Sequence, residues 1–119
     1  MSRETNPARR VIAILGAGGV LGAAISTTLA GEADTDLVLS DVSAGSLQST
    51  IDGLATPVET VIADVTEFAQ VEAVVDRAIE RFGRLDVLIS NAGVLAPNGR
   101  IHNLTDGDWQ RVIDINLMG

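Results

Sequence analysis

Short apolar runs alternate along this chain with longer segments in which apolar residues recur every three or four positions. The short runs, at residues 10–15, 36–41, 58–62 and 85–90, predict four buried strands. The longer segments predict helices over residues 20–31, 44–54, 66–82 and from about 106 towards 119. Strands that alternate with amphipathic helices are typical of an α/β protein whose parallel sheet is covered on both faces.

The helix over 66–82 has the clearest pattern. Thr66 is its predicted N-cap, and Gly83 is its predicted end. In the same way, Ser43 is the predicted N-cap of the second helix, and Gly31 is the predicted end of the first. One face collects its apolar residues: Phe68, Val71, Val74, Val75, Ala78, Ile79 and Phe82. Because crossovers between parallel strands are right-handed, we expect a Rossmann-type doubly wound sheet of order 3-2-1-4. A ligand would lie in the crevice between strands 1 and 4.

A glycine-rich turn follows the first strand and leads into the first helix. Glycine reaches backbone angles that side chains forbid and lets the main chain approach a phosphate closely. The helix start adds unpaired N–H groups and a partial charge of roughly +0.5. The turn therefore predicts a cradle for a dinucleotide pyrophosphate, and the alternative is a strand-to-helix turn without a ligand. The candidate residues are Gly16, Gly18, Gly19, Val20, Leu21 and Gly22.

Asp41 ends the second apolar run, about twenty residues after the turn. A carboxylate there can accept hydrogen bonds from the adenosine ribose hydroxyls. It would also repel a 2′-phosphate, because two like charges about 4 Å apart near a surface cost on the order of 4 kcal/mol. Asp41 therefore favours NAD over NADP. Its alternative role is that of a turn residue or helix cap ahead of Ser43.

The length, composition and net charge limit the domain organisation and the kinds of partner that we expect. The 119 residues suit one domain, which we expect over 10–119 after a flexible lead at 1–9. No apolar run approaches twenty residues, and the first ten residues hold no apolar signal segment. The chain has no cysteine, and its net charge of −8 argues against nucleic-acid and membrane partners. We expect a cytoplasmic protein.

Further motifs occur in the order and spacing of a known family. They are Asp64-Val65 after the third strand, Asn91-Ala92-Gly93 after the fourth, Asn116-Leu117 in the last helix, and the lead Arg81-Phe82-Gly83-Arg84-Leu85-Asp86. With the glycine turn, they make residues 10–119 resemble the first half of a classical short-chain dehydrogenase/reductase. The resemblance implies hydride transfer between NAD(P) and an alcohol or carbonyl substrate.

The resemblance also implies roles for these residues. Asp64 and Val65 would contact adenine, Asn91, Ala92 and Gly93 would pass close to the nicotinamide ribose, and Asn116 would extend the catalytic proton relay through a water molecule. Each motif has a plainer alternative. Asp64 could cap the following helix, Asn-Ala-Gly is a fair turn sequence, and Asn116 could be exposed on its helix.

The chain departs from the family pattern at two positions of the turn. Leu15 stands where the family usually has Thr, so a hydroxyl that ties the turn to the Asn-Ala-Gly segment is missing. Val20 stands where classical members have their second glycine. A β-branched residue avoids positive φ, so we expect Val20 to take an ordinary backbone conformation.

The sequence contains no tyrosine and no lysine, and its basic residues are all arginines. The family's catalytic Ser and Tyr-x-x-x-Lys pair lie beyond the helix that carries Asn116. We therefore expect a fragment truncated before the later strands, with strand 4 as an open apolar edge. By the same resemblance, we expect the complete protein to form homo-oligomers.

Two other functions fit parts of the pattern. A non-catalytic nucleotide-binding or regulatory module would keep the glycine turn and Asp41 without the catalytic residues. A methyltransferase also combines a glycine turn with an acid after strand 2, but Asn91-Ala92-Gly93 is not typical of that class. His102, the only histidine, fits a solvated loop better than a substrate contact.

Overall fold

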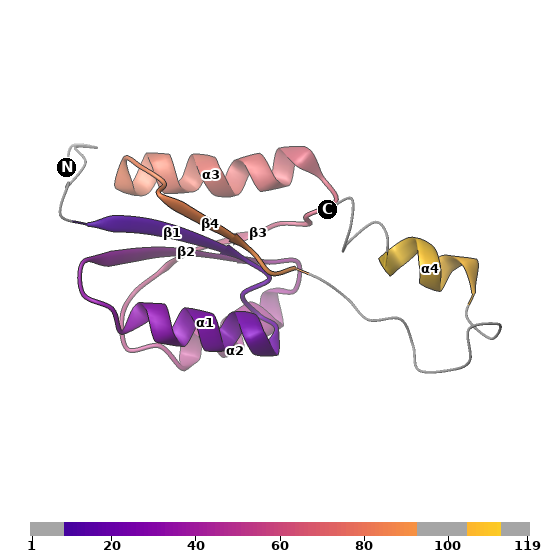
Figure 1. The fold of residues 1–119 in the computed structure, drawn as a ribbon, viewed down its shortest axis with the longest axis horizontal. Helices are drawn as coiled ribbons and strands as arrows, with labels where there is room; N and C mark the ends of the chain where they lie inside the picture. The colour runs from indigo at the N-terminus through magenta and orange to yellow at the C-terminus, as the bar shows by residue number, and fades with distance from the viewer. Residues whose placement is uncertain (1–8, 93–104, 113–119) are drawn as a thin grey trace.

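The computed structural model describes residues 9–92 and 105–112. These residues form one parallel sheet with helices on both faces (Figure 1). The strands are β1 (Arg10–Leu15), β2 (Thr35–Asp41), β3 (Glu59–Ile62) and β4 (Val87–Ser90). The helices are α1 (Val20–Ala30), α2 (Ala44–Asp52), α3 (Phe68–Phe82) and α4 (Asp106–Val112). The predicted α/β class is confirmed.

The strand order is β3-β2-β1-β4, and all three neighbouring pairs are parallel. This is the predicted order of a Rossmann-type sheet. Ile14 at the centre of the sheet is in register with Leu39 on β2 and with Ile89 on β4. Since the strands run in one direction, their carboxyl ends meet at one edge of the sheet, where such folds bind ligands.

The core lies on both sides of β1, whose residues after Arg10 are all buried. Alternate residues face opposite sides of the sheet, as the strand period of two requires. Val11, Ala13 and Leu15 pack under α3, with Val74 and Ala78. The other side of the sheet packs against α1 and α2 (Figure 1). The core there contains Ile12, Ile14, Leu37 and Leu39 of the sheet together with Leu47 of α2. Burying each large aliphatic side chain contributes about 1.5–3 kcal/mol.

The start of α3 differs from the prediction. Thr66 was the expected N-cap, but its hydroxyl donates to Asp64 Oδ1 at 2.7 Å, and its backbone N–H donates to the same oxygen at 2.9 Å. This local turn delays the helix, so that Glu67 occupies the N-cap position. Phe68, predicted on the buried face, is 80% exposed at the first helical position. Gly83 ends the helix as predicted, with a φ of +83°.

The first two helices, α1 and α2, differ in how their N-termini are capped. Ser43 caps α2 as predicted, because its hydroxyl oxygen accepts the backbone N–H of Ser46 at 3.2 Å. Gly19 occupies the N-cap position of α1, where no side chain caps the helix and no acidic residue lies in the first turn. The first N–H groups of an α-helix have no acceptor within the helix. Those of α1 are therefore available to another acceptor.

β4 is an edge strand of the described sheet, as predicted. It is shorter than predicted, and its side chains Val87 and Leu88 are 42% and 46% exposed. Asp86 fixes its start, because Asp86 Oδ2 accepts the backbone N–H of Val11 at 2.8 Å and the backbone N–H of Asp86 donates to the Val11 carbonyl at 2.9 Å. Arg84 donates to the same carboxylate at 2.9 Å.

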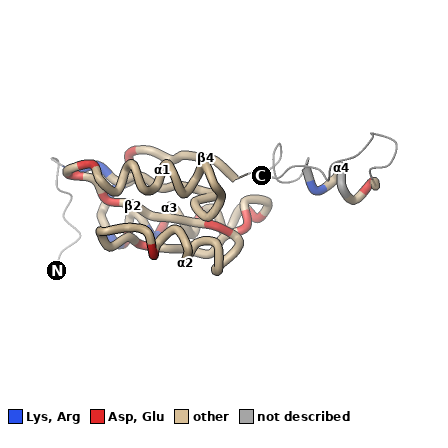
Figure 2. The backbone as a smooth tube through the Cα atoms, turned by 90° about the horizontal axis from the view of Figure 1, so that it is seen from below, with Lys and Arg blue, Asp and Glu red and all other residues tan. Residues whose placement is uncertain are grey.

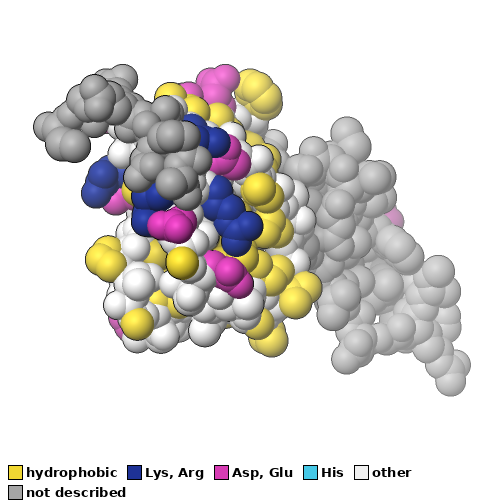
Figure 3. Space-filling view, turned by 60° about the vertical axis from the view of Figure 1, so that its left-hand side comes forward, with side chains coloured by type: hydrophobic (Ala, Val, Ile, Leu, Met, Phe, Trp, Pro, Cys, Tyr) yellow, Lys and Arg dark blue, Asp and Glu magenta, His cyan; other side chains and the backbone are white. Residues whose placement is uncertain are grey.

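Charged residues lie mainly at the ends of the elements and in the loops (Figure 2). At the strand-start end, arginine and acidic side chains lie side by side on the surface (Figure 3). Arg9 pairs with Asp36 at 2.7 Å, and Arg77 and Arg81 both approach Glu59. Exposed pairs of this kind contribute little to stability, because water and salt screen the charges. Within residues 9–92 and 105–112, no helix combines the length and apolar character needed to cross a membrane.

Candidate functional site

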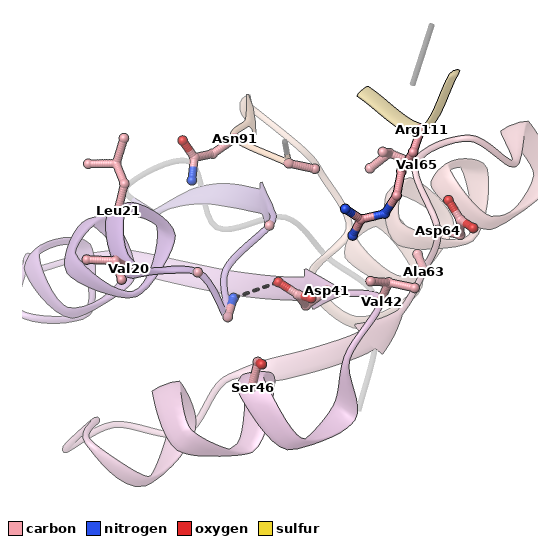
Figure 4. A pocket seen from close by; sticks show the side chains of 14 residues that line it. Val20, Leu21, Asp41, Val42, Ser46, Ala63, Asp64, Val65, Asn91 and Arg111 are labelled. Carbon is pink, nitrogen blue, oxygen red and sulfur yellow. Dashed lines mark hydrogen bonds between the residues drawn. The ribbon is translucent and has the colours of Figure 1, made fainter. Parts of the chain in front are cut away.

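A cavity of about 480 Å³ opens at the carboxyl ends of the strands (Figure 4). It lies between the β1–α1 turn, the ends of β2 and β3, and the segment that follows β4. Ligand sites of small molecules commonly have volumes of roughly 300–1,000 Å³. The lining residues are Gly16, Gly18, Gly19, Val20, Leu21, Asp41, Val42, Ser46, Ala63, Asp64, Val65, Asn91, Ala92 and Arg111.

Most of the residues singled out in the sequence line this cavity, although the chain brings them from four separate segments. Gly22 is buried in the first turn of α1 and does not line it. Gly93, His102 and Asn116 lie outside the described residues. The structure therefore brings together ten of the predicted site residues: Gly16, Gly18, Gly19, Val20, Leu21, Asp41, Asp64, Val65, Asn91 and Ala92.

Close packing explains the glycines of the turn. Gly16 has a φ of +81°, and a Cβ there would lie 2.7 Å from the backbone nitrogen of Ala92. A Cβ on Gly22 would overlap the carbonyl oxygen of Gly16, and one on Gly18 would lie 2.7 Å from Ser46 Cβ. The left-handed conformation is thus needed only at Gly16, whereas Gly18 and Gly22 leave room for neighbouring backbone and side-chain atoms.

Hydrogen bonds hold the turn against β2 and β4. The backbone N–H groups of Gly16 and Ala17 both donate to the carbonyl of Ser40 at 2.9 Å. The backbone N–H of Asn91 donates to the Leu15 carbonyl at 3.0 Å. This main-chain bond joins the turn to the Asn-Ala segment at the position where the sequence lacks the family's usual Thr hydroxyl.

Val20 and Leu21 begin α1 at the cavity wall, and their side chains are 95% and 62% exposed. Val20 has an ordinary negative φ, as predicted, since Asp34 is the only non-glycine residue with a positive φ in the described ranges. The N-terminal end of α1 therefore presents unpaired N–H groups and a partial positive charge beside the cavity. An anion is the chemical group that such a helix start favours.

Asp41 stands opposite the turn at the end of β2. Its Oδ2 accepts the backbone N–H of Gly18 at 2.9 Å, and its Oδ1 accepts the backbone N–H of Ser43 at 3.0 Å. The turn role considered from the sequence is therefore present. Each carboxylate oxygen has further acceptor capacity, and the side chain lies on the cavity wall (Figure 4).

Asp64 and Val65 follow β3 on the far side of the cavity. Hydrogen bonds from the hydroxyl and then the backbone N–H of Thr66 lower the pKa of the Asp64 carboxyl. Because these bonds stabilise the charged form, Asp64 is an anion at neutral pH. Asp64 thus forms a local turn with Thr66 beside the cavity. The helix cap considered for Asp64 from the sequence is not formed, because Glu67 occupies the N-cap position of α3.

Sequence reasoning missed four lining residues: Val42, Ser46, Ala63 and Arg111. Val42 and Ala63 are direct neighbours of Asp41 and Asp64 in the sequence, so their positions could have been found. Nothing in the local sequence points to Ser46 or Arg111. Arg111 reaches the cavity from α4 (Figure 4) and adds a positive charge to a wall that carries Asp41 and Asp64.

Comparison with known proteins agrees with this arrangement. The family model described as short chain dehydrogenase matches residues 10–119. The chain belongs to the short-chain dehydrogenase family. It is 38% identical over 119 residues to a cis-4-hydroxycyclohexanecarboxylate dehydrogenase of Sinomonas cyclohexanicum, an alignment that covers 94% of this chain and 45% of the relative.

A levodione reductase is similar in both sequence and structure. The protein of Leifsonia aquatica is 37% identical over 115 residues, which cover 92% of this chain and 43% of that protein. The crystal structure of a levodione reductase superimposes with a TM-score of 0.82 at 37% identity, over 91% of this chain and 43% of that structure. The chain thus spans less than half the length of these relatives.

Proposed function

We propose that this chain forms the dinucleotide-binding part of an NAD(P)-dependent oxidoreductase that transfers hydride between a nicotinamide cofactor and an alcohol or carbonyl substrate. One observation carries the proposal. A single cavity is lined by the glycine turn, by Asp41, by Asp64 with Val65, and by Asn91 with Ala92. These are the segments that the family resemblance assigns to successive parts of a dinucleotide.

The residues present fit such a cofactor. The turn lacks side chains where a Cβ would meet other atoms, and the uncapped N–H groups at the start of α1 suit the pyrophosphate. Asp41 would hold the adenosine ribose, Asp64 and Val65 the adenine, and Asn91 and Ala92 the nicotinamide ribose. Gly93 and Asn116 would continue the site. When bound, the nicotinamide ring supplies the position that gives or takes the hydride.

We further propose that NAD is preferred over NADP. Asp41 has its position fixed by the N–H groups of Gly18 and Ser43, so its charge cannot easily turn away from the ribose. Hydrogen bonds from ribose hydroxyls to a charged acceptor contribute roughly 1.5–3 kcal/mol each. A 2′-phosphate would instead meet a negative charge at close range.

We propose an alcohol or a carbonyl compound as the substrate class. Family membership and the dehydrogenase and reductase names of the two relatives support this class. The 119 residues contain neither tyrosine nor lysine, and these residues form the family's proton-transfer pair. We therefore propose that this chain alone binds the cofactor without turnover, which is also the behaviour of a non-catalytic nucleotide-binding module.

Calorimetric titration of the 119-residue chain with NAD tests the proposal. Gly18→Ala should abolish or strongly weaken binding, because the new Cβ has no room beside Ser46. Gly45→Ala is the matched control, since a Cβ there meets no atom within 4 Å, and it should bind as the unaltered chain does. Absence of saturable heat with the unaltered chain, or equal affinities of the two glycine variants, would overturn the proposal.

A further inference from the structure

Thr50 reaches the glycine turn from the neighbouring helix. It lies in the last turn of α2, is only 6% exposed, and its hydroxyl donates to the carbonyl oxygen of Ala17 at 2.8 Å. Ala17 itself is fully buried. The carbonyl of Ser46 lies farther from the hydroxyl, at 3.4 Å. Because a hydroxyl has a single proton to donate, the shorter bond to Ala17 is the dominant one.

The same helix also supports the next residue of the turn. A Cβ on Gly18 would lie 2.7 Å from Ser46 Cβ, and Ser46 precedes Thr50 by one helical turn on the same face of α2. The backbone N–H of Gly18 also donates to the carboxylate of Asp41. Two consecutive residues of the turn, Ala17 and Gly18, are therefore fixed by side chains outside the turn.

The hydroxyl of Thr50 supplies the hydrogen-bond donor that the buried carbonyl of Ala17 needs. The N–H of Ala17 is satisfied by Ser40, but its buried carbonyl lies between a strand and a helix and belongs to neither. A buried carbonyl without a donor is costly, so the chain would turn this peptide towards water. Rotation of the peptide between Ala17 and Gly18 would also move the Gly18 N–H away from Asp41.

We propose that Thr50 is a positioning residue for cofactor binding: its hydroxyl fixes the Ala17–Gly18 peptide and thereby the shape of the dinucleotide turn. The inference rests on the proposed function of that turn. Thr50 does not line the cavity, so it acts through the turn and not by touching the cofactor. In the ligand-free chain it keeps the turn in the conformation that accepts the pyrophosphate, which lowers the ordering needed on binding.

Three variants of the 119-residue chain separate this role from general stability. Thr50→Val removes the hydroxyl at nearly constant volume and should raise the Kd for NAD about 3- to 10-fold, the range that one net hydrogen bond corresponds to. Thr50→Ser retains the hydroxyl and should restore the affinity. Ser49→Ala removes an exposed hydroxyl that bonds to the Gly45 carbonyl on the same helix, and should leave the Kd unchanged.

The affinities are measured by calorimetry at a temperature at which every variant is fully folded. A purely structural role for Thr50 would lower the melting temperature of Thr50→Val and leave its Kd equal to that of the unaltered chain, which would overturn the inference. Failure of Thr50→Ser to restore binding would overturn it too.

A second readout needs no cofactor. Amide resonances of Gly18 and Gly19 in the ligand-free chain should shift and exchange faster in Thr50→Val than in Ser49→Ala. If the unaltered chain does not bind NAD, the proposed function fails, while these resonances still decide whether Thr50 sets the turn. Unchanged turn resonances in Thr50→Val would overturn the inference.

Discussion

The carboxylate of Asp41 accepts the backbone N–H of Gly18 at 2.9 Å, so the end of β2 and the turn after β1 are joined by a direct hydrogen bond. The residue assigned to the adenosine ribose thus also shapes the turn assigned to the pyrophosphate. A substitution at Asp41 can therefore change cofactor choice through its charge or change the turn through its acceptor, and suitable variants separate the two.

Asp41→Asn keeps an oxygen that can accept the Gly18 N–H but removes the charge. We expect the affinity for NAD to fall about 10-fold, because a hydrogen bond to a neutral acceptor is weaker than one to a carboxylate. The affinity for NADP should rise, since the repulsion of its 2′-phosphate disappears. Calorimetry with both cofactors measures the ratio of the affinity for NAD to the affinity for NADP. Asp52→Asn, an exposed change on α2, is the control, and an unchanged ratio in Asp41→Asn would contradict the assignment.

Val20→Gly should tighten NAD binding by about 3-fold. The exposed Val20 side chain stands beside the free N–H groups of α1, and its removal lets an anion approach the helix start more closely. The same change should slightly lower the melting temperature, because glycine favours the helix less than valine by a few tenths of a kcal/mol. Affinity and stability should thus move in opposite directions, and weaker binding would show that Val20 does not restrict the turn.

Asp86→Asn tests, as a function of pH, how the hydrogen bonds of Asp86 between the start of β4 and β1 stabilise the fold. Hydrogen bonds from Arg84 and then from the Val11 N–H lower the pKa of the Asp86 carboxyl. A lowered pKa in the folded state gives stability that is present above the ordinary aspartate pKa of about 3.9 and is lost as the pH falls through the folded value. The variant should therefore be less stable than the unaltered chain at pH 7. Denaturant titrations should show this difference shrink below about pH 4, and a gap that does not depend on pH would argue against the ion pair as its source.

Leu88→Lys tests the open edge of the sheet. Leu88 is 46% exposed on β4, whose outer side has no neighbouring strand among the described residues. An apolar unpaired edge promotes association with other chains, and a lysine blocks it. Light scattering should show less self-association. Ser49→Lys is the control. It changes the net charge in the same way, from −8 to about −7, at a position on α2 away from the sheet edge. That charge change alone does not reduce association, so equal behaviour of the two variants would rule out the edge as the cause.

Periodicity was sufficient to predict the layers of this fold. The alternation of short apolar runs with helical patterns predicted the four strands, because buried parallel strands and covering helices leave strong signals. The strand order followed from the right-handedness of crossovers between parallel strands. The predicted start of α3 was wrong because of a local turn. Asp64 takes both the hydroxyl and the N–H of Thr66, and this competing turn moves the helix start to Phe68.

The cavity was predictable where its residues follow strand ends, and not elsewhere. Asp41, Asp64 and Asn91 follow apolar runs, and parallel strands bring such positions to one edge of the sheet. Arg111 and Thr50 lie inside helices, and their contact with the site depends on how those helices pack. No spacing rule along the sequence carries that information.

The most direct test of the account is a nuclear magnetic resonance titration of the 119-residue chain with NAD. The amide resonances of Gly18, Val20 and Leu21 in the turn, and those of Asp64 and Asn91 across the cavity, should shift together and saturate. Amides at the strand-start end, such as that of Asp36, should stay unchanged. Shifts confined to that opposite end, or no shifts at all with saturating NAD, would contradict the claim that this corner of the sheet binds an adenine dinucleotide.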